Sequence, residues 1–249
     1  MHNFARCAAF WAFIIEGSLW LAILRGLMLL VGCLGLLWGI SNVARGADSD
    51  AFMDLDAHLL KFETFNRTTA AITLDSTAAR DLDACDIHSQ RALLLLEIPL
   101  ADAALRSGTI REFDQRSRSL EARAQLTLRC SPRDSLVWLV LFGLKTEHGL
   151  LDERTFDLLV MSYDTSPNEA WIAVRRVVVA VPTILAAPEA VRERILTEFQ
   201  SLIRHRFFEM PALAYSSASS QVRSVLQTRI SQLSAGEQAE FARAVERLK

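Results

Sequence analysis

An apolar run over residues 7–44 constrains this chain most, because the residues after it have the mixed composition of a folded soluble domain. Arg25 divides the run, and the second part, 26–44, carries no charge. Its length is close to the roughly 20 apolar residues that a helix needs to cross a bilayer. We therefore predict a leader at 1–25, one transmembrane helix at 26–44 and a separate body behind it.

Basic residues near the apolar run predict its orientation in a bacterial inner membrane. Arg6 and Arg25 precede the expected span, and only Arg45 follows it closely. Basic residues favour the cytoplasmic side, so we expect a cytoplasmic N-terminus and a periplasmic body. The small residues at Ala44 and Gly46 also fit a signal-peptidase site, which leaves a retained anchor and a cleaved signal both open.

Three further interpretations of the apolar run stay open. Translation from Met28 would remove the leader, and the sequence before Cys33 resembles a lipidation signal, although the residues after Cys33 remain apolar. Gly35 and Gly39 have the small-xxx-small spacing that lets membrane helices approach closely. These two glycines are the candidates for self-association within the membrane.

The composition of the body predicts an all-α fold. Glycine is scarce after residue 47, whereas alanine, leucine, arginine and glutamate are abundant. These residues favour helices. We expect either a helical bundle or a short stack of helix pairs of the tetratricopeptide type. The net charge of −2 gives no long-range attraction to nucleic acid, and we predict no nucleic-acid partner.

Capping and helix-breaking residues predict the helix boundaries. Thr109 and Ser234 each stand three residues before a glutamate, which is the spacing of a capping box. The serine-rich stretch at 216–220 is a candidate linker, so we divide the chain after the membrane segment into a helical body, 45–215, and a C-terminal helix pair, 216–249. The expected helices are 51–62, 87–105, 110–128, 133–144, 153–163, 168–180, 189–207, 222–233 and 235–248.

Export would place the body in an oxidising compartment. Cys85 and Cys130 are its two cysteines, so a single pairing is available, and we predict that disulfide. Two buried free thiols are the alternative, and a cytoplasmic body would favour them.

A weak internal repeat supports the stacked arrangement. The Ser-Pro pair that ends at Pro132 recurs at Pro167, 35 residues later, close to the period of 34 of tetratricopeptide repeats. Trp138 and Leu141 reproduce the W-x2-L spacing of that repeat, and Trp171 follows the second proline. We predict that these five residues pack paired helices together.

With the anchor in front, the segments SPRDSLVWLVL and SPNEAWIAVRRV resemble degenerate tetratricopeptide-like, membrane-anchored proteins of bacterial envelope polysaccharide gene clusters. The resemblance covers roughly 130–205 and includes no catalytic motif. It implies a scaffold or accessory role in exopolysaccharide or O-antigen production or export, through docking of a protein partner of the envelope machinery.

The sequence shows no constellation that predicts a metal, a cofactor or a catalytic residue. Asp81, Asp83, Asp86 and His88 crowd one polar stretch, but their spacing matches no calcium loop. We interpret the stretch as a solvated turn beside the disulfide. We expect a protein that is not an enzyme.

A basic face is the remaining candidate site. Arg192, Arg204 and Arg206 would present cations to an anionic ligand, although interleaved glutamates favour a face of mixed charge. The alternative to the scaffold hypothesis is an envelope enzyme or a glycan-binding subunit whose site combines scattered Asp, Glu and Arg residues, with Asp83, Asp86 and Arg175 as the residues to test.

Overall fold

The structure is a computed structural model with two compact units, Met1–Ala51 and Phe52–Lys249, and each is described by itself. The residues that it describes are 24–40, 52, 55, 59, 66–76, 79 and 82–248.

The first unit is described by one helix, 24–40, whose side chains are exposed along almost its whole length. Among the described residues, no helix has the length and apolar character needed to cross a membrane. The predicted leader up to residue 23 and the end of the predicted span, 41–44, lie outside the described residues.

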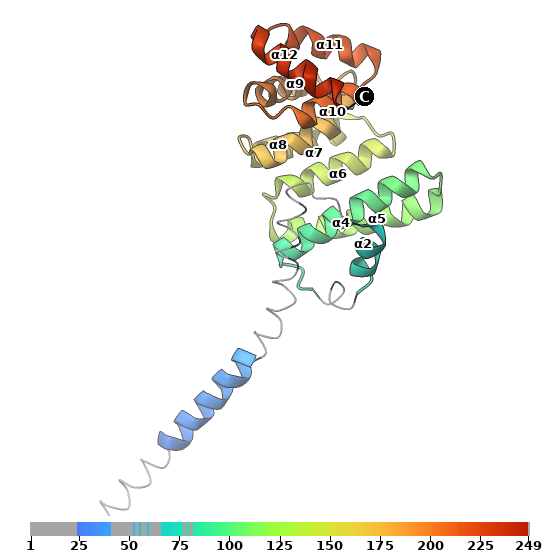
Figure 1. The fold of residues 1–249 in the computed structure, drawn as a ribbon. Coiled ribbons are helices and arrows are strands. Elements are labelled where there is room, and N and C mark those ends of the chain that lie inside the picture. The colour runs from blue at the N-terminus through green and yellow to red at the C-terminus, as the bar shows by residue number, and fades with distance from the viewer. Residues whose placement is uncertain are drawn as a thin grey trace, which may run out of the picture. The chain divides into compact units, whose positions relative to one another are not determined.

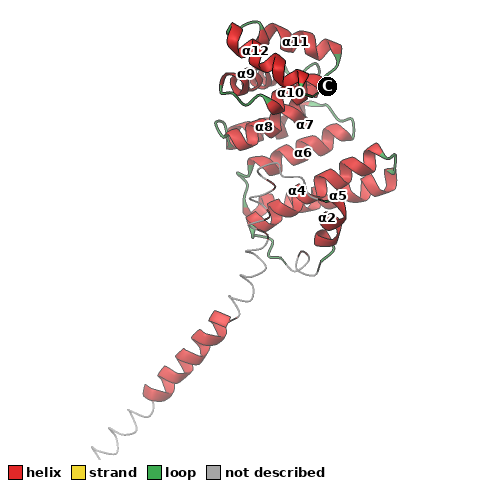
Figure 2. Ribbon diagram, in the orientation of Figure 1, coloured by secondary structure: helices red, strands yellow, loops and turns green. Residues whose placement is uncertain are grey.

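The second unit is a stack of helices that begins with α2 and α4 and ends with α11 and α12 (Figure 1). Every regular element in the described part of this unit is helical, as Figure 2 shows, which confirms the all-α class. The tetratricopeptide-like arrangement stays a prediction. The elements are α2 (Arg67–Leu74), α4 (Ile87–Arg106), α5 (Ile110–Cys130), α6 (Ser135–Glu147), α7 (Glu153–Thr165), α8 (Ala170–Ala180), η1 (Val181–Thr183), α9 (Glu189–Arg204), α10 (Glu209–Ser217), α11 (Ser220–Ile230) and α12 (Ala235–Glu246).

Neighbouring helices pack in a regular order. The long helices α4 and α5 lie against each other, as do α6 and α7. Helix α8 contacts α6, α9 and α10, and α10 contacts α12. One apolar core extends from α4 to α12, so the C-terminal helices α11 and α12 belong to the same compact unit as the rest of the body.

A smaller apolar cluster forms where α2 meets α4. Phe52, Ala70 and Leu93 are buried in it, and Leu59 packs against its edge. The segment 51–62, predicted as a helix, is helical at its three described positions, 52, 55 and 59.

Local capping explains most boundaries. Ser234 and Glu237 form the predicted capping box at the start of α12. The capping box predicted at Thr109 is wrong, because the Thr109 hydroxyl makes no cap bond and instead lies 2.9 Å from the Ser107 hydroxyl. Gly149 ends the turn after α6 with a φ of 75°, a conformation that glycine adopts without strain.

The predicted bridge is present. The sulfur atoms of Cys85 and Cys130 are bonded, with their Cα atoms 5.3 Å apart. The bond joins the turn before α4 to the last residue of α5, so it fixes the open end of the helix pair formed by these two long helices.

Candidate functional site

A groove with a volume of about 1010 Å³ lies among α4, α5, α6, α8 and α10. Its lining is mostly apolar and includes Leu95, Ile98, Val140, Val179, Met210 and Leu213. Ile98 is 36% exposed and Leu213 is 41% exposed, so the groove opens to solvent. An open apolar groove of this kind is a common feature of surfaces that bind another chain.

Gly143 of α6 faces Val179 of α8 at the groove. A Cβ atom at this position would meet Val179 Cγ1 at 3.6 Å, which is an ordinary contact, and nothing else within 4 Å. Glycine in the middle of a helix costs about 1 kcal/mol relative to alanine. Gly143 therefore lowers the stability of helix α6 at a position that lines the groove.

Charged groups border the groove unevenly. Asp102 of α4 and Glu147 of α6 line it, and they lie close enough to interact. Burial raises the pKa of the Glu147 carboxyl above its ordinary value, and the Asp102 carboxylate raises it further. Arg175 of α8 also lines the groove, but its guanidinium donates to the carbonyls of Trp171, at 3.0 Å, and Leu59, at 2.8 Å. Asp102 also pairs with Arg106, whose Nη2 lies 2.5 Å from Asp102 Oδ2. The border at α4 and α6 therefore holds one ion-paired carboxylate, Asp102, and a second carboxylate, Glu147.

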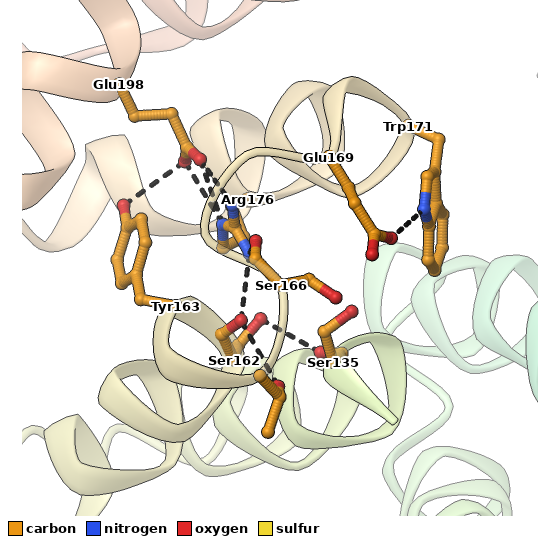
Figure 3. Close-up of polar contacts among 9 residues, drawn as sticks. Ser135, Ser162, Tyr163, Ser166, Glu169, Trp171, Arg176 and Glu198 are labelled. Carbon is orange, nitrogen blue, oxygen red and sulfur yellow. Dashed lines mark hydrogen bonds and ion pairs between the residues drawn. The ribbon is translucent and has the colours of Figure 1, made fainter. Parts of the chain in front are cut away.

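A buried polar network holds α7, α8 and α9 together next to this groove's α8 wall (Figure 3). Arg176 of α8 is fully buried. Its Nη2 donates to Glu198 Oε1 of α9 at 2.6 Å, and its Nη1 donates to the carbonyls of Ser162, at 2.9 Å, and Ser166, at 3.1 Å. The Tyr163 hydroxyl donates to Glu198 Oε2 at 3.2 Å.

The contacts of the network join packed helices. The guanidinium of Arg176 stacks over the Tyr163 ring, 4.5 Å from its centroid, and its donors are engaged on α7, on the C-cap residue Ser166 and on α9. Burial raises the pKa of the Glu198 carboxyl, and the bonds from Arg176 offset this only partly. Burial and the Glu198 charge together raise the pKa of the Tyr163 phenol well above its ordinary value. None of these groups lines the groove.

A second buried ion pair links α4 to the start of α6. Arg91 Nη2 lies 2.8 Å from Asp134 Oδ2, whose side chain is 1% exposed. Asp134 also caps α6 by accepting from the backbone of Leu136 at 3.1 Å. The Arg91 guanidinium lies 5.5 Å from the centre of the Trp171 ring of α8. One aspartate therefore starts a helix and ties it to a neighbour.

The five residues predicted to pack helix pairs lie at the junctions around α6 and α8. Leu141 is buried in the main core, and Trp138 and Trp171 pack against that core while partly exposed. Trp138 Nε1 donates to the Pro132 carbonyl at 2.9 Å. Pro132 and Pro167 lie in the loops before α6 and α8.

The acidic stretch before α4 is occupied by turn and cap bonds. Asp83 Oδ1 accepts from the backbone of Cys85 at 2.8 Å, and Asp86 Oδ2 accepts from the Ser89 hydroxyl at 2.7 Å. Asp81 lies outside the described residues. Within the described ranges, no group of three or more His, Cys, Asp or Glu residues is placed to hold a metal ion.

Two of the three arginines of the proposed basic face, Arg192 and Arg206, form local bonds. Arg192 donates to the carbonyl oxygens of Ile184 and Ala187 and pairs with Glu189 at 2.9 Å. Arg206 pairs with Glu240 at 2.8 Å. Arg204 is exposed at the end of α9. Local bonds therefore take up two of the three cations.

Gly35 and Gly39 lie on the helix 24–40, and a Cβ atom at either position would meet nothing within 4 Å. The predicted self-association through these glycines stays a prediction. The groove and the Arg176 network were not predicted, although the two adjacent arginines inside the apolar stretch 172–181 were a signal for a buried ion pair.

Comparison with family models, with curated proteins and with solved structures found no match for this chain.

Proposed function

We propose that this chain is a membrane-anchored helical docking protein of the bacterial envelope, which holds an amphipathic helix of a partner protein in the groove formed by α4, α5, α6, α8 and α10. The groove itself is the observation that carries the proposal, because its apolar side chains come from five helices and the groove is open to solvent. Hydrophobic burial of a partner's apolar face is the driving force.

The size of the groove selects the kind of occupant. A helix about 10 Å across rises about 1.5 Å per residue, so a cavity of about 1010 Å³ takes in roughly two turns. Two turns present apolar anchors at positions i, i+3 or i+4, and i+7, the pattern by which helices bind apolar grooves.

The charge at the border of the groove indicates which charge the partner helix carries beside its apolar anchors. Glu147 lies at the border of α4 and α6 beside the ion pair of Asp102 and Arg106. It stands in the last turn of α6, where the helix dipole disfavours a negative charge. A lysine or arginine beside the anchors of the partner helix would relieve both the mutual repulsion and the dipole interaction. The partner is therefore an amphipathic helix with a basic flank.

The envelope setting is supported by other features. The apolar run at 26–44 supports an anchor, and the bond between Cys85 and Cys130 is typical of proteins in oxidising compartments. The resemblance to proteins of envelope polysaccharide clusters favours a role in the production or export of such a polymer. A reporter fused after Lys249 that is active only outside the cytoplasm tests this topology, and an inactive reporter would contradict it.

Peptide binding tests the docking surface directly. The probe is a fluorescein-labelled amphipathic peptide of about 12 residues with leucines at i, i+4 and i+7 and a flanking lysine, and the protein is the full chain in phosphatidylcholine nanodiscs. We expect Leu213→Asp to weaken binding at least tenfold, because it places a charge in the apolar lining. Leu126→Asp is the matched control, since Leu126 is similarly exposed, at 37%, but lies on α5 outside the groove.

Two results would overturn the docking proposal. One is equal affinity of the peptide for the wild type and the Leu213→Asp variant. The other is equal weakening by both aspartates, which would indicate non-specific adsorption. In the bacterium, a photocrosslinking residue at position 213, and not one at 126, should trap a single partner whose crosslinked segment is an amphipathic helix.

A further inference from the structure

The exposed face of α5 carries a line of arginines. At 100° per residue, Arg111, Arg118 and Arg129 fall within about 20° of one another around the helix. All three are exposed. They are spread over about 27 Å, at the usual helical rise. The buried side chains of α5, such as Phe113 and Leu120, project from the opposite side.

This line, the α5 arginine stripe (Arg111, Arg118 and Arg129), contains no acidic residue. The positions between its arginines are Gln115, Ala122 and Gln125, which are also exposed. Within the described part of the chain, no hydrogen bond or ion pair of the three guanidinium groups is found. The stripe is a straight array of three cations facing solvent.

The neighbouring acids of α5 are engaged elsewhere or stand to the side. Glu112 lies 3.8 Å from Arg116, and Glu121 lies 2.7 Å from Lys145 of α6. Asp114 is about 60° away around the helix. The positive charge of the stripe is therefore not neutralised along its own line.

We propose that the α5 arginine stripe rests on the anionic phospholipid headgroups of the bilayer that holds the apolar N-terminal segment. This inference depends on the membrane attachment in the proposed function. A straight row of cations without large apolar side chains fits a flat, negatively charged surface and does not insert into it. Each basic residue near an anionic leaflet strengthens attachment roughly fivefold, so three contribute on the order of 100-fold.

Such a contact orients the body rather than anchoring it. Attachment of this strength is weak for a free protein but large for one that is already tethered to the same surface. With α5 against the headgroups, the body has a fixed side toward the lipid. Salt at about 0.5 M should release that contact, because exposed charges are screened.

Solvent access to a label on the stripe tests the proposal. The full chain carries Cys7→Ser and Cys33→Ser, which leaves the bonded pair intact, and a fluorophore is attached at Gln115→Cys. Acrylamide quenching is compared in phosphatidylcholine vesicles and in vesicles with about one phosphatidylglycerol in three lipids. We expect at least twofold less quenching in the anionic vesicles and recovery in high salt. A label at Ser224→Cys on α11 should show no difference.

Charge-matched variants assign the effect to the stripe. Replacing its three arginines by glutamine should restore quenching at position 115 to the value in neutral vesicles. Replacing Arg223, Arg243 and Arg247 of α11 and α12 by glutamine removes the same charge and should leave the protection unchanged.

Each remaining outcome overturns the proposal in a distinct way. Chains that float with neutral vesicles but show equal quenching in both lipids refute the stripe and leave the anchor standing. Chains that do not float with neutral vesicles refute the anchor and the inference together. Protection by soluble polyglutamate in neutral vesicles, without protection in anionic ones, would assign the stripe to an acidic protein partner.

Discussion

Replacing Arg176 by methionine should destabilise the body severely. The substitution keeps the approximate length of the buried side chain but removes the cation from Glu198, whose side chain is only 10% exposed. It also removes the donors to the carbonyls of Ser162 and Ser166. An uncompensated buried charge and two unsatisfied carbonyls should lower the free energy of unfolding by about 3–5 kcal/mol, a large part of the roughly 5–15 kcal/mol of a typical domain.

The pKa of Glu198 predicts how the destabilisation by Arg176→Met changes with pH. Because burial raises the pKa of Glu198 above its ordinary value of 4.5, the folded state holds this proton more tightly than the unfolded chain. The stabilisation by protonated Glu198 is complete below the unfolded pKa and is lost as the pH rises through the higher folded pKa. Arg176 lowers the pKa of Glu198 in the folded state. Removing Arg176 therefore raises this pKa and extends the pH range in which the protonated form of Glu198 stabilises the fold. The Arg176→Met variant should therefore lose less stability at about pH 5 than at about pH 8.

Urea unfolding of the full chain, followed by circular dichroism, measures the effect. Glu198→Leu alone should be about as destabilising as Arg176→Met, because it leaves a buried cation. The double variant should fall within about 2 kcal/mol of the wild type, since the two charges leave together. With single losses of at least about 3 kcal/mol, this corresponds to a coupling energy of at least about 4 kcal/mol. Losses below about 1 kcal/mol for the single variants, or strictly additive losses in the double variant, would refute the reasoning.

Four further substitutions test other features by the same assay. Cys85→Ser opens a loop with a sequence separation of 45 and should cost about 4 kcal/mol in the chain-entropy model; an unchanged unfolding midpoint would contradict this. Gly143→Ala should raise the free energy of unfolding by up to about 1 kcal/mol, because its Cβ atom meets only Val179 Cγ1, at 3.6 Å. Ser234→Ala should cost about 1 kcal/mol, whereas Thr109→Ala, which removes no cap bond, should be nearly neutral.

The sequence predicted the helices where local chemistry decides their ends. Asp152 caps α7 by accepting from the backbone of Thr155 at 2.8 Å, and Gly149 ends the preceding turn. Pro188 precedes α9 directly. These signals act within a few residues of the backbone that they satisfy, so one chain suffices to recognise them.

The prediction missed a short helix whose local sequence signals are weak. Helix α10 was not predicted, because Phe208 at its N-cap makes no side-chain cap bond and Pro211 breaks the expected pattern near its start. The proline is tolerated since it falls in the first turn, where no intrahelical donor is needed. The serine-rich stretch read as a linker from residue 216 is helical through Ser217.

The groove was out of reach of sequence reasoning for a different reason. Its lining comes from several helices that are distant in sequence, and most of its apolar residues look like ordinary core in their own helices. Only the packing of α8 against both α6 and α10 leaves these side chains facing one shared space. Thr109 shows the same limit on a smaller scale, because its hydroxyl had a second partner, Ser107, that the capping pattern does not include.

Two ion pairs between helices, Arg91–Asp134 and Arg176–Glu198, explain why an apolar groove stays open. Apolar walls favour closing on each other, yet directional bonds fix the helices that carry those walls. Asp134 ties α6 to α4 through Arg91, and Glu198 ties α9 to α8 through Arg176. Hydrogen-bonded ion pairs define one arrangement of helices, whereas apolar contacts tolerate several. The Arg176→Met, Glu198→Leu double variant therefore tests the effect of this ion pair on the groove separately from its effect on stability. The variant should unfold near the wild-type midpoint but bind the amphipathic peptide several-fold more weakly. Wild-type affinity would show that the Arg176–Glu198 ion pair does not determine the shape of the groove.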